Sequence, residues 1–89
     1  MLKTFKLTVS TPNGNVFDEE VLEISVRGSE GSLAVRAGHI PFICATKEDK
    51  IRITNAEADD LFAEVGEGIL TVTQEKVTLL CGKFQMTNE

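Results

Sequence analysis

The strongest constraint on the fold is a series of short segments in which apolar and polar residues alternate. In Thr4–Val9 the odd-numbered positions are apolar and the even-numbered positions are polar, as expected of a half-buried β-strand. Similar runs recur about every ten residues, at Phe42–Thr46, Ile51–Thr54, Gly68–Thr73 and Lys76–Cys81. The polar turns between them include Glu48–Lys50 and Gln74–Glu75. Because each strand has an apolar face that only another sheet can cover, this spacing predicts an all-β sandwich or barrel.

Turn-forming residues indicate where the other strands begin and end. Pro12 cannot donate a hydrogen bond to a ladder, and Asn13-Gly14 suits the positive φ angles of a tight hairpin turn. The chain should therefore return antiparallel, as one long strand over residues 16–26 with a bulge where its charges are unevenly distributed. The next turn, strand and breaker are Gly28–Gly31, Ser32–Arg36 and Gly38–Pro41. In that short strand we expect Leu33 and Val35 to face inward.

The segment Asn55–Val65 allows two interpretations. It could form a capped helix with Leu61, Phe62 and Val65 on one side. The alternative is a hairpin tip at Glu57–Asp59 followed by a strand. Periodicity does not separate the two, but the β elements on both sides favour the hairpin.

Length and charge exclude several classes of protein. The chain of 89 residues has room for one domain, spanning residues 1–89, with a single core. Its formal net charge is -5 and its lysines and arginines do not cluster, so nucleic acid is not an expected partner. No stretch approaches the ~18 consecutive apolar residues of a membrane span, and the first residues alternate instead of forming a signal-peptide core.

The residues needed for catalysis or for metal binding do not come together in the sequence. His39 is the only histidine and has no cysteine nearby, so neither a metal site nor a nucleophile with its base is expected. Gly66-Glu67-Gly68 lacks the third glycine of a dinucleotide fingerprint and precedes a strand. Paired carboxylates occur only in polar stretches, at Glu19-Glu20, Glu48-Asp49 and Asp59-Asp60. We therefore predict no catalytic, cofactor or metal site.

The two cysteines lie far apart in apolar runs. Cys44 follows Phe42-Ile43, and Cys81 follows Leu79-Leu80. Buried free thiols are the favoured interpretation. A disulfide remains open if the fold brings their Cα atoms within about 7 Å.

One stretch resembles a known family signature. Residues 28–43, Gly-Ser-Glu-Gly-Ser-Leu-Ala-Val-Arg-Ala-Gly-His-Ile-Pro-Phe-Ile, are similar to the G-x-x-G-x-L-G-I-x-P-G-H-x-P-L-L motif of ATP synthase epsilon subunits. The order of the flanking strands agrees over nearly the whole chain. Four positions depart from the family pattern: Ser32 replaces an acidic residue, Ala34 a glycine, Ala37 a proline and Glu67 one glycine of a pair.

The resemblance implies a fold and a role. The fold would be a flattened sandwich or barrel of about ten short, mostly antiparallel strands. The role would be that of a non-catalytic rotor subunit of the central stalk, which links the gamma subunit to the c-ring and supports proton-driven ATP synthesis. Such a subunit is peripheral, at the cytoplasmic face of an energy-transducing membrane, and touches the membrane only through the complex. The chain ends before the family's C-terminal helical hairpin, so no ATP binding is expected.

The resemblance also implies contact residues. By analogy, the c-ring contact comprises Glu30, Gly31, Ser32, Arg36 and His39, and the gamma contact lies near Thr11 and Cys44. Arg36 is the candidate for a charge-assisted hydrogen bond to a carboxylate. His39 could contact a partner or could fix its own turn. The alternative function is a stand-alone β-domain that binds a small ligand.

Overall fold

The described part of the chain forms ten β-strands. The computed structural model describes residues 3–28, 31–38, 40–56 and 58–87. The first five strands are β1 (Phe5–Thr11), β2 (Gly14–Val21), β3 (Glu23–Gly28), β4 (Gly31–Arg36) and β5 (Phe42–Thr46). The last five are β6 (Asp49–Thr54), β7 (Leu61–Val65), β8 (Gly68–Val72), β9 (Lys76–Cys81) and β10 (Phe84–Thr87). Among the described residues there is no helix long and apolar enough to cross a membrane.

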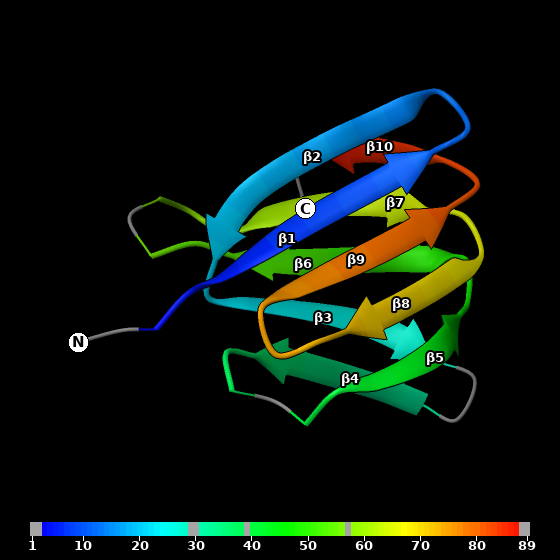
Figure 1. The fold of residues 1–89 in the computed structure, drawn as a ribbon. Helices are drawn as coiled ribbons and strands as arrows, with labels where there is room; N and C mark the ends of the chain where they lie inside the picture. Colours follow the sequence, from blue (N-terminus) through cyan, green and yellow to red (C-terminus); the bar gives the residue numbers. More distant parts are fainter. Residues whose placement is uncertain (1–2, 29–30, 39, 57, 88–89) are drawn as a thin grey trace.

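The strands form two layers, as the sequence predicts. Strands β5, β8, β9, β1 and β2 lie side by side in one layer, and β4, β3, β6, β7 and β10 in the other (Figure 1). The layers join at one corner, where Gly28 of β3 pairs with Thr46 of β5. Nearly all pairs are antiparallel, but β1 pairs with β9 in parallel. The predicted flattened, mostly antiparallel sandwich of about ten strands is therefore confirmed.

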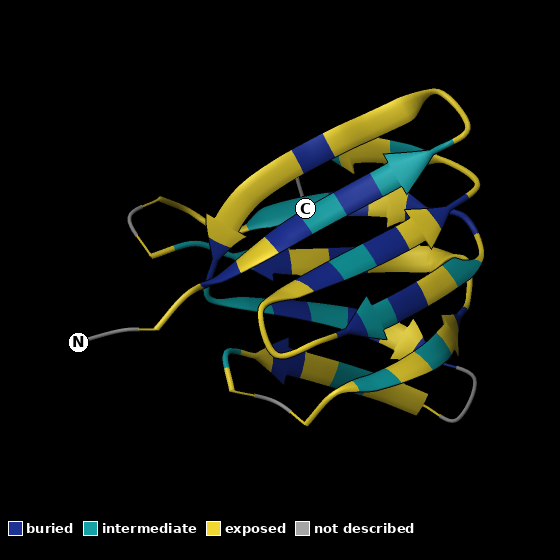
Figure 2. Cartoon of the chain, in the orientation of Figure 1, coloured by how far each residue is buried: buried dark blue, intermediate teal, exposed yellow. Residues whose placement is uncertain are grey.

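The core lies between the layers and follows the alternation of the strands. In β1, Phe5, Leu7 and Val9 are buried while Lys6 is exposed, and the same alternation is visible along most strands (Figure 2). The buried apolar side chains form one cluster: Phe5, Leu7, Val9, Phe17, Val21, Ile24, Val26, Val35, Ile51, Ile53, Ala63, Val65, Leu70, Val72, Val77, Leu79 and Cys81. Burial of these faces drives folding, because apolar area removed from water stabilises by about 25 cal/mol per Å².

The first hairpin has the predicted direction but not the predicted backbone. Its register pairs Thr11 with Gly14, so the loop consists of Pro12 and Asn13. Gly14 has a φ of 112°, whereas Asn13 keeps a negative φ. Because proline fixes its own φ near −65°, the turn starts with ordinary backbone angles and only Gly14 needs the positive one. The ladder shifts register between Val9 and Ser10, which places a bulge near the turn.

The predicted long strand over residues 16–26 is wrong. The chain bends at Leu22 and forms two strands in different layers, β2 and β3. Phe17 and Val21 are buried at odd positions, whereas Ile24 and Val26 are buried at even positions. A continuous strand cannot place both sets on one face, so the chain crosses to the other layer. The Leu22 amide donates to the Thr54 carbonyl at 2.8 Å and anchors the crossing.

The hairpin interpretation of residues 55–65 is confirmed. Strand β7 runs antiparallel to β6, with Ile53 opposite Leu61. The Asn55 side-chain amide donates to the Asp59 carbonyl at 3.2 Å across the tip. Glu57, part of the predicted tip, lies outside the described residues. The polar turn predicted at Glu48–Lys50 is too long, because Asp49 and Lys50 already belong to β6.

The last strand is one that the sequence pattern does not predict. Strand β10 pairs antiparallel with β7, and Phe84 contacts Phe17 of β2 with ring centroids 6.4 Å apart. This contact links the two layers at the edge opposite the β3–β5 corner.

Gly68 should be irreplaceable because β9 passes directly over it. A Cβ at this position would overlap the Leu80 carbonyl oxygen and lie 2.9 Å from the Cys81 Cα. We expect Gly68→Ala to lower the free energy of unfolding by about 3 kcal/mol, since backbone cannot yield as a side chain can. Gly82→Ala is the matched control, because a methyl group at that position would have no neighbouring atom within 4 Å. Urea titration of both variants checks this, and equal stabilities would contradict it.

Thr46 carries a hydroxyl that the fold does not use. Its Oγ1 has no hydrogen-bond partner among the described residues, and the residue is only 5% exposed. We expect Thr46→Val to raise the free energy of unfolding by about 1 kcal/mol, because the valine removes an unsatisfied buried polar group. Thr78→Val, at a half-buried position of β9, should change stability by less than about 0.5 kcal/mol. A destabilised Thr46→Val in thermal unfolding would show that the hydroxyl has a partner.

Candidate protein-binding surface

The outer face of one layer carries apolar side chains that the core does not use. Each of β5, β8 and β9 carries a large apolar residue on its outward face as well as on its inward face. Ile43 is 71% exposed, Ile69 47% and Leu80 49%. Across the strands Leu80 pairs with Ile69, and Ile69 pairs with Ala45. We call these four residues, Ile43, Ala45, Ile69 and Leu80, the apolar strip.

The apolar strip is extended by small hydroxyl-bearing residues and ends in two open depressions. Beside it, Thr71 pairs with both Thr78 and Ile43. A depression of 330 Å³ at one end is lined by Ser10, Thr11, Pro12, Glu67, Gly68, Ile69, Leu80 and Cys81. A second, of 540 Å³, is lined by Gly28, Gly31, Ser32, Leu33, Ile43, Cys44 and Ala45. Both depressions are open to solvent, so they suit a protein surface better than an enclosed small ligand.

The residues predicted to contact gamma lie at the ends of the strip. Thr11, at the end of β1, lines the smaller depression together with Leu80. Cys44 of β5 lines the larger one together with Ile43. Sequence reasoning missed Ile43, Ile69 and Leu80 themselves. The available signal was that these strands have apolar residues in both alternating phases, which predicts a cover on both faces.

The residues predicted to contact the c-ring are not all brought together. Gly31 and Ser32 begin β4, and Arg36 ends it. At about 3.3 Å per residue, four steps along a strand separate Ser32 and Arg36 by about 13 Å. Gly31 and Ser32 share their depression with Cys44, which the resemblance assigns to the other partner. Glu30 and His39 lie outside the described residues.

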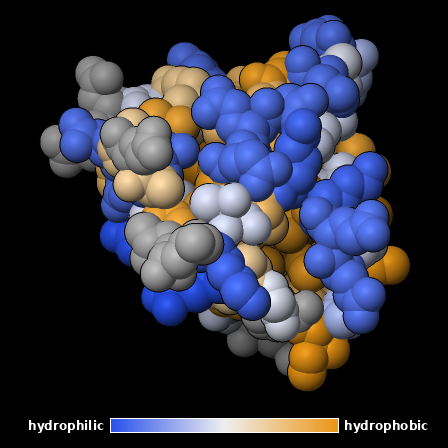
Figure 3. Space-filling view, turned by 60° about the vertical axis from the view of Figure 1, so that its left-hand side comes forward, coloured by the Kyte–Doolittle hydropathy of each residue, from blue (hydrophilic) through white to orange (hydrophobic). Residues whose placement is uncertain are grey.

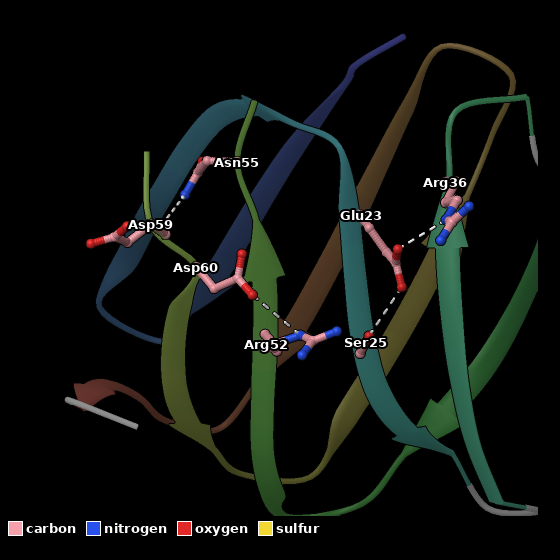
Figure 4. A network of polar contacts seen from close by, with 7 residues as sticks. All are labelled: Glu23, Ser25, Arg36, Arg52, Asn55, Asp59 and Asp60. Atoms are coloured by element: carbon pink, nitrogen blue, oxygen red, sulfur yellow. Dashed lines mark hydrogen bonds and ion pairs between the residues drawn. The ribbon is translucent and has the colours of Figure 1, made fainter. Parts of the chain in front are cut away.

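Arg36 is held in an ion pair. Its Nε donates to Glu23 Oε1 at 2.9 Å across the β3–β4 ladder, where the two residues are register partners (Figure 4). Ser25 Oγ approaches the other oxygen, Oε2, at 3.4 Å. The Glu23 side chain is 15% exposed, whereas that of Arg36 is 77% exposed. The guanidinium therefore projects into solvent from a largely covered carboxylate.

The outer face of the second layer is polar. Arg27 pairs with Asp49 at 3.6 Å and Arg52 with Asp60 at 3.7 Å, all with substantially exposed side chains (the second pair is drawn in Figure 4). Polar side chains also dominate the view from the side of the β6–β7 loop, where hydrophobic side chains show between them (Figure 3). Exposed pairs of this kind contribute at most about 1 kcal/mol each. The two outer faces therefore differ in character.

The two cysteines are free, as the sequence favoured, but only Cys81 is buried. Cys44 is half-buried, which corrects the prediction of two buried thiols. Its position at the mouth of a depression explains the difference, because β5 lies at the corner between the layers, where it pairs with β3 only at Thr46. Burial raises the pKa of the Cys44 thiol. Burial also raises the pKa of Cys81, against a smaller opposing effect of a backbone hydrogen bond with Lys83.

Chemically reactive groups do not cluster within the part of the chain that the structure describes. No group of three or more His, Cys, Asp or Glu side chains there could hold a metal ion. The paired carboxylates Glu19-Glu20, Glu48-Asp49 and Asp59-Asp60 are all exposed, as predicted. Together, the fold and the apolar strip define a small β-sandwich with an exposed apolar surface on one layer.

Comparison with known proteins identifies the family. Residues 4–86 match the family model described as "ATP synthase, Delta/Epsilon chain, beta-sandwich domain". The chain is 33% identical over 87 residues to the ATP synthase epsilon chains of Bacillus thuringiensis and Bacillus mycoides. The match covers 98% of this chain and 65% of each relative. The chain belongs to the β-sandwich family of ATP synthase delta and epsilon chains.

Solved structures confirm the fold. A chain in the Euglena gracilis mitochondrial ATP synthase, in a structure titled OSCP/F1/c-ring, superimposes with a TM-score of 0.87 at 18% identity, covering 93% of this chain and 53% of that one. A chain in the Tetrahymena thermophila mitochondrial ATP synthase central stalk and c-ring gives 0.76 at 12% identity, covering 92% and 66%. Identities this low establish the shared sandwich alone.

The unequal cover of the two thiols should be visible in their reactivity. We expect Cys44 to react with iodoacetamide before Cys81, because only Cys44 is partly accessible. Only the thiolate form of a cysteine reacts with iodoacetamide, and burial raises the pKa of Cys44. The reaction rate of Cys44 should therefore reach half its maximum at a pH above the pKa of a free cysteine, which is about 8.5. Mass spectrometry of timed samples measures both rates. Equal rates in the folded chain, as expected only in denaturant, would contradict the burial difference.

Proposed function

We propose that this chain acts as a non-catalytic rotor subunit of an ATP synthase central stalk, linking the gamma subunit to the c-ring and supporting proton-driven ATP synthesis. Membership of the delta/epsilon β-sandwich family supports this, as do the names of the matching relatives. The protein would sit peripherally at the cytoplasmic face of the membrane and attach to it only through the complex. Its contribution would be mechanical and not chemical.

The observation that carries this proposal is the apolar strip. Ile43, Ile69 and Leu80 are exposed on strands whose other face is already filled by the core. A soluble domain gains nothing from such a surface unless a partner covers it. We assign the strip, with Thr11 and Cys44 at its ends, to the gamma subunit.

The size of the molecule is sufficient for this contact. A stable interface buries about 600–1,000 Å² on each partner, and the accessible surface of the chain is 5653 Å². The contact would therefore use roughly a tenth to a sixth of the surface. The outer face of β5, β8 and β9 can supply it while β4 remains free.

We assign the c-ring contact to β4 and its flanking turns. Arg36 presents a charged group that matches carboxylates of polar loops. Gly31 and Ser32 lie at the other end of the same strand, so the contact would extend along β4. Glu30 and His39 remain predictions within this surface. A close-packed sandwich between the two partners deforms little and would transmit torque.

Co-purification tests the assignment of the two surfaces. We expect the wild-type chain to bind gamma and the c-ring, and Leu80→Lys to lower the affinity for gamma at least about tenfold, because a lysine ammonium would lie in an apolar contact. Met86→Lys is the control, since Met86 is similarly exposed at 45% but lies on the other layer. Arg36→Ala should instead weaken binding to the c-ring.

Three outcomes would contradict the proposal. Loss of gamma binding in Met86→Lys as well as Leu80→Lys, with circular dichroism showing that both variants are folded, would show that the contact is not confined to the apolar strip. Unchanged gamma binding in Leu80→Lys would remove the apolar strip from the interface. Unchanged c-ring binding when Arg36 and His39 are both alanine would remove the c-ring assignment.

A further inference from the structure

Among the ion pairs of the described residues, Glu23–Arg36 is the one with a largely covered member. In the other four pairs both side chains are at least 38% exposed. In this pair the Glu23 side chain is 15% exposed, and its backbone is fixed on both sides by pairing with Arg36 of β4 and with Thr54 of β6. The position of Glu23 is thus constrained by two strands, and its carboxylate holds the more exposed side chain of Arg36.

The geometry of the pair leaves one edge of the arginine available. A guanidinium has five N–H donors in a planar fork. Glu23 takes the Nε donor through Oε1, while its second oxygen, Oε2, is approached by Ser25 and not by Arg36. Within the described residues the two terminal nitrogens of Arg36, Nη1 and Nη2, donate to no protein acceptor. These two nitrogens form the edge that binds a carboxylate with two parallel hydrogen bonds.

We propose that Glu23 is a positioning residue that holds Arg36 by Nε, so that the Nη1 and Nη2 edge faces outward to bind a carboxylate of the partner. This inference rests on the proposed function, and it adds a residue that neither the sequence nor the family signature singles out. A free arginine loses much rotamer freedom when it is fixed in an interface, whereas an arginine already held loses less. Lysine could not replace Arg36, because a single ammonium has no second fixed edge.

Glu23→Gln separates positioning from simple charge. If Glu23 were only a negative charge near the contact, its removal would tighten binding of a partner carboxylate, because a repulsion is lost. If Glu23 holds Arg36, the same change weakens binding. We expect the affinity for the detergent-solubilised c-ring to fall about threefold to tenfold, and to do so at both 0.15 M and 0.5 M salt, since salt screens the competing repulsion.

A double-mutant cycle shows whether Glu23 acts through Arg36. Glu23→Gln should have no further effect in the Arg36→Ala background, and Arg36→Lys should weaken binding nearly as much as Arg36→Ala. Asp60→Asn is the matched control, because it removes a carboxylate from another exposed arginine, Arg52. An equal effect of Glu23→Gln with and without Arg36 would overturn the proposal in favour of a structural role.

A second measurement needs no partner. In the NMR spectrum of the full chain the Arg36 Nε–H group should exchange with water more slowly, and show a higher heteronuclear NOE, than that of Arg27, which contacts Asp49 through Nη1. Glu23→Gln should reduce this difference. An Arg36 signal as mobile as that of Arg27 in the wild type would overturn the positioning role.

The outcomes distinguish this inference from the proposed function. If the wild-type chain does not bind the c-ring, the proposed function and the carboxylate contact both fail. If Arg36→Ala weakens binding but Glu23→Gln does not, the proposed function stands and the positioning role of Glu23 fails.

Discussion

Burial of one face of every strand against the opposite layer is the constraint on which this structure depends. A chain of 89 residues has one core to stabilise it. That core takes side chains from both layers, so neither sheet has a covered face without the other. The bend at Leu22, the β3–β5 corner and the contact of Phe17 with Phe84 all bring the layers face to face.

The sequence was informative wherever alternation was regular. Strands such as β5 and β9 were predicted at the residues where they occur, because most of their inward positions are apolar. The prediction of one long strand over residues 16–26 was wrong because the alternation of apolar residues changes phase at Leu22. In the sequence such a change looks like a bulge, whereas in the structure the chain crosses there to the other layer. Strand β10 is too short, at four residues, to display a period. The family resemblance supplied three of the predicted contact residues, Thr11, Cys44 and Arg36. Two residues of the apolar strip, Ile69 and Leu80, could be recognised only once the structure showed which face of each strand packs into the core.

The two outer faces suit different kinds of contact. The apolar strip offers contact area but no directional hydrogen bonds, which suits a broad apolar interface. The Glu23–Arg36 pair offers direction with little area, since a planar fork accepts a carboxylate in few orientations. A joint in a rotating assembly would benefit from both, because area resists separation and oriented hydrogen bonds resist slipping. Each property follows from a side chain pattern on a particular strand.

The parallel ladder between β1 and β9 ties residues near the beginning of the chain to residues near its end. Strand β1 therefore has no partner on that side until residues 76–81 have been synthesised. Pairings between strands so distant in sequence slow folding, because a long loop must close, at a cost in chain entropy, before the stabilising contacts can form. Folding of this sandwich should consequently be completed only after β9 has been synthesised, and until then one side of β1 has no partner strand.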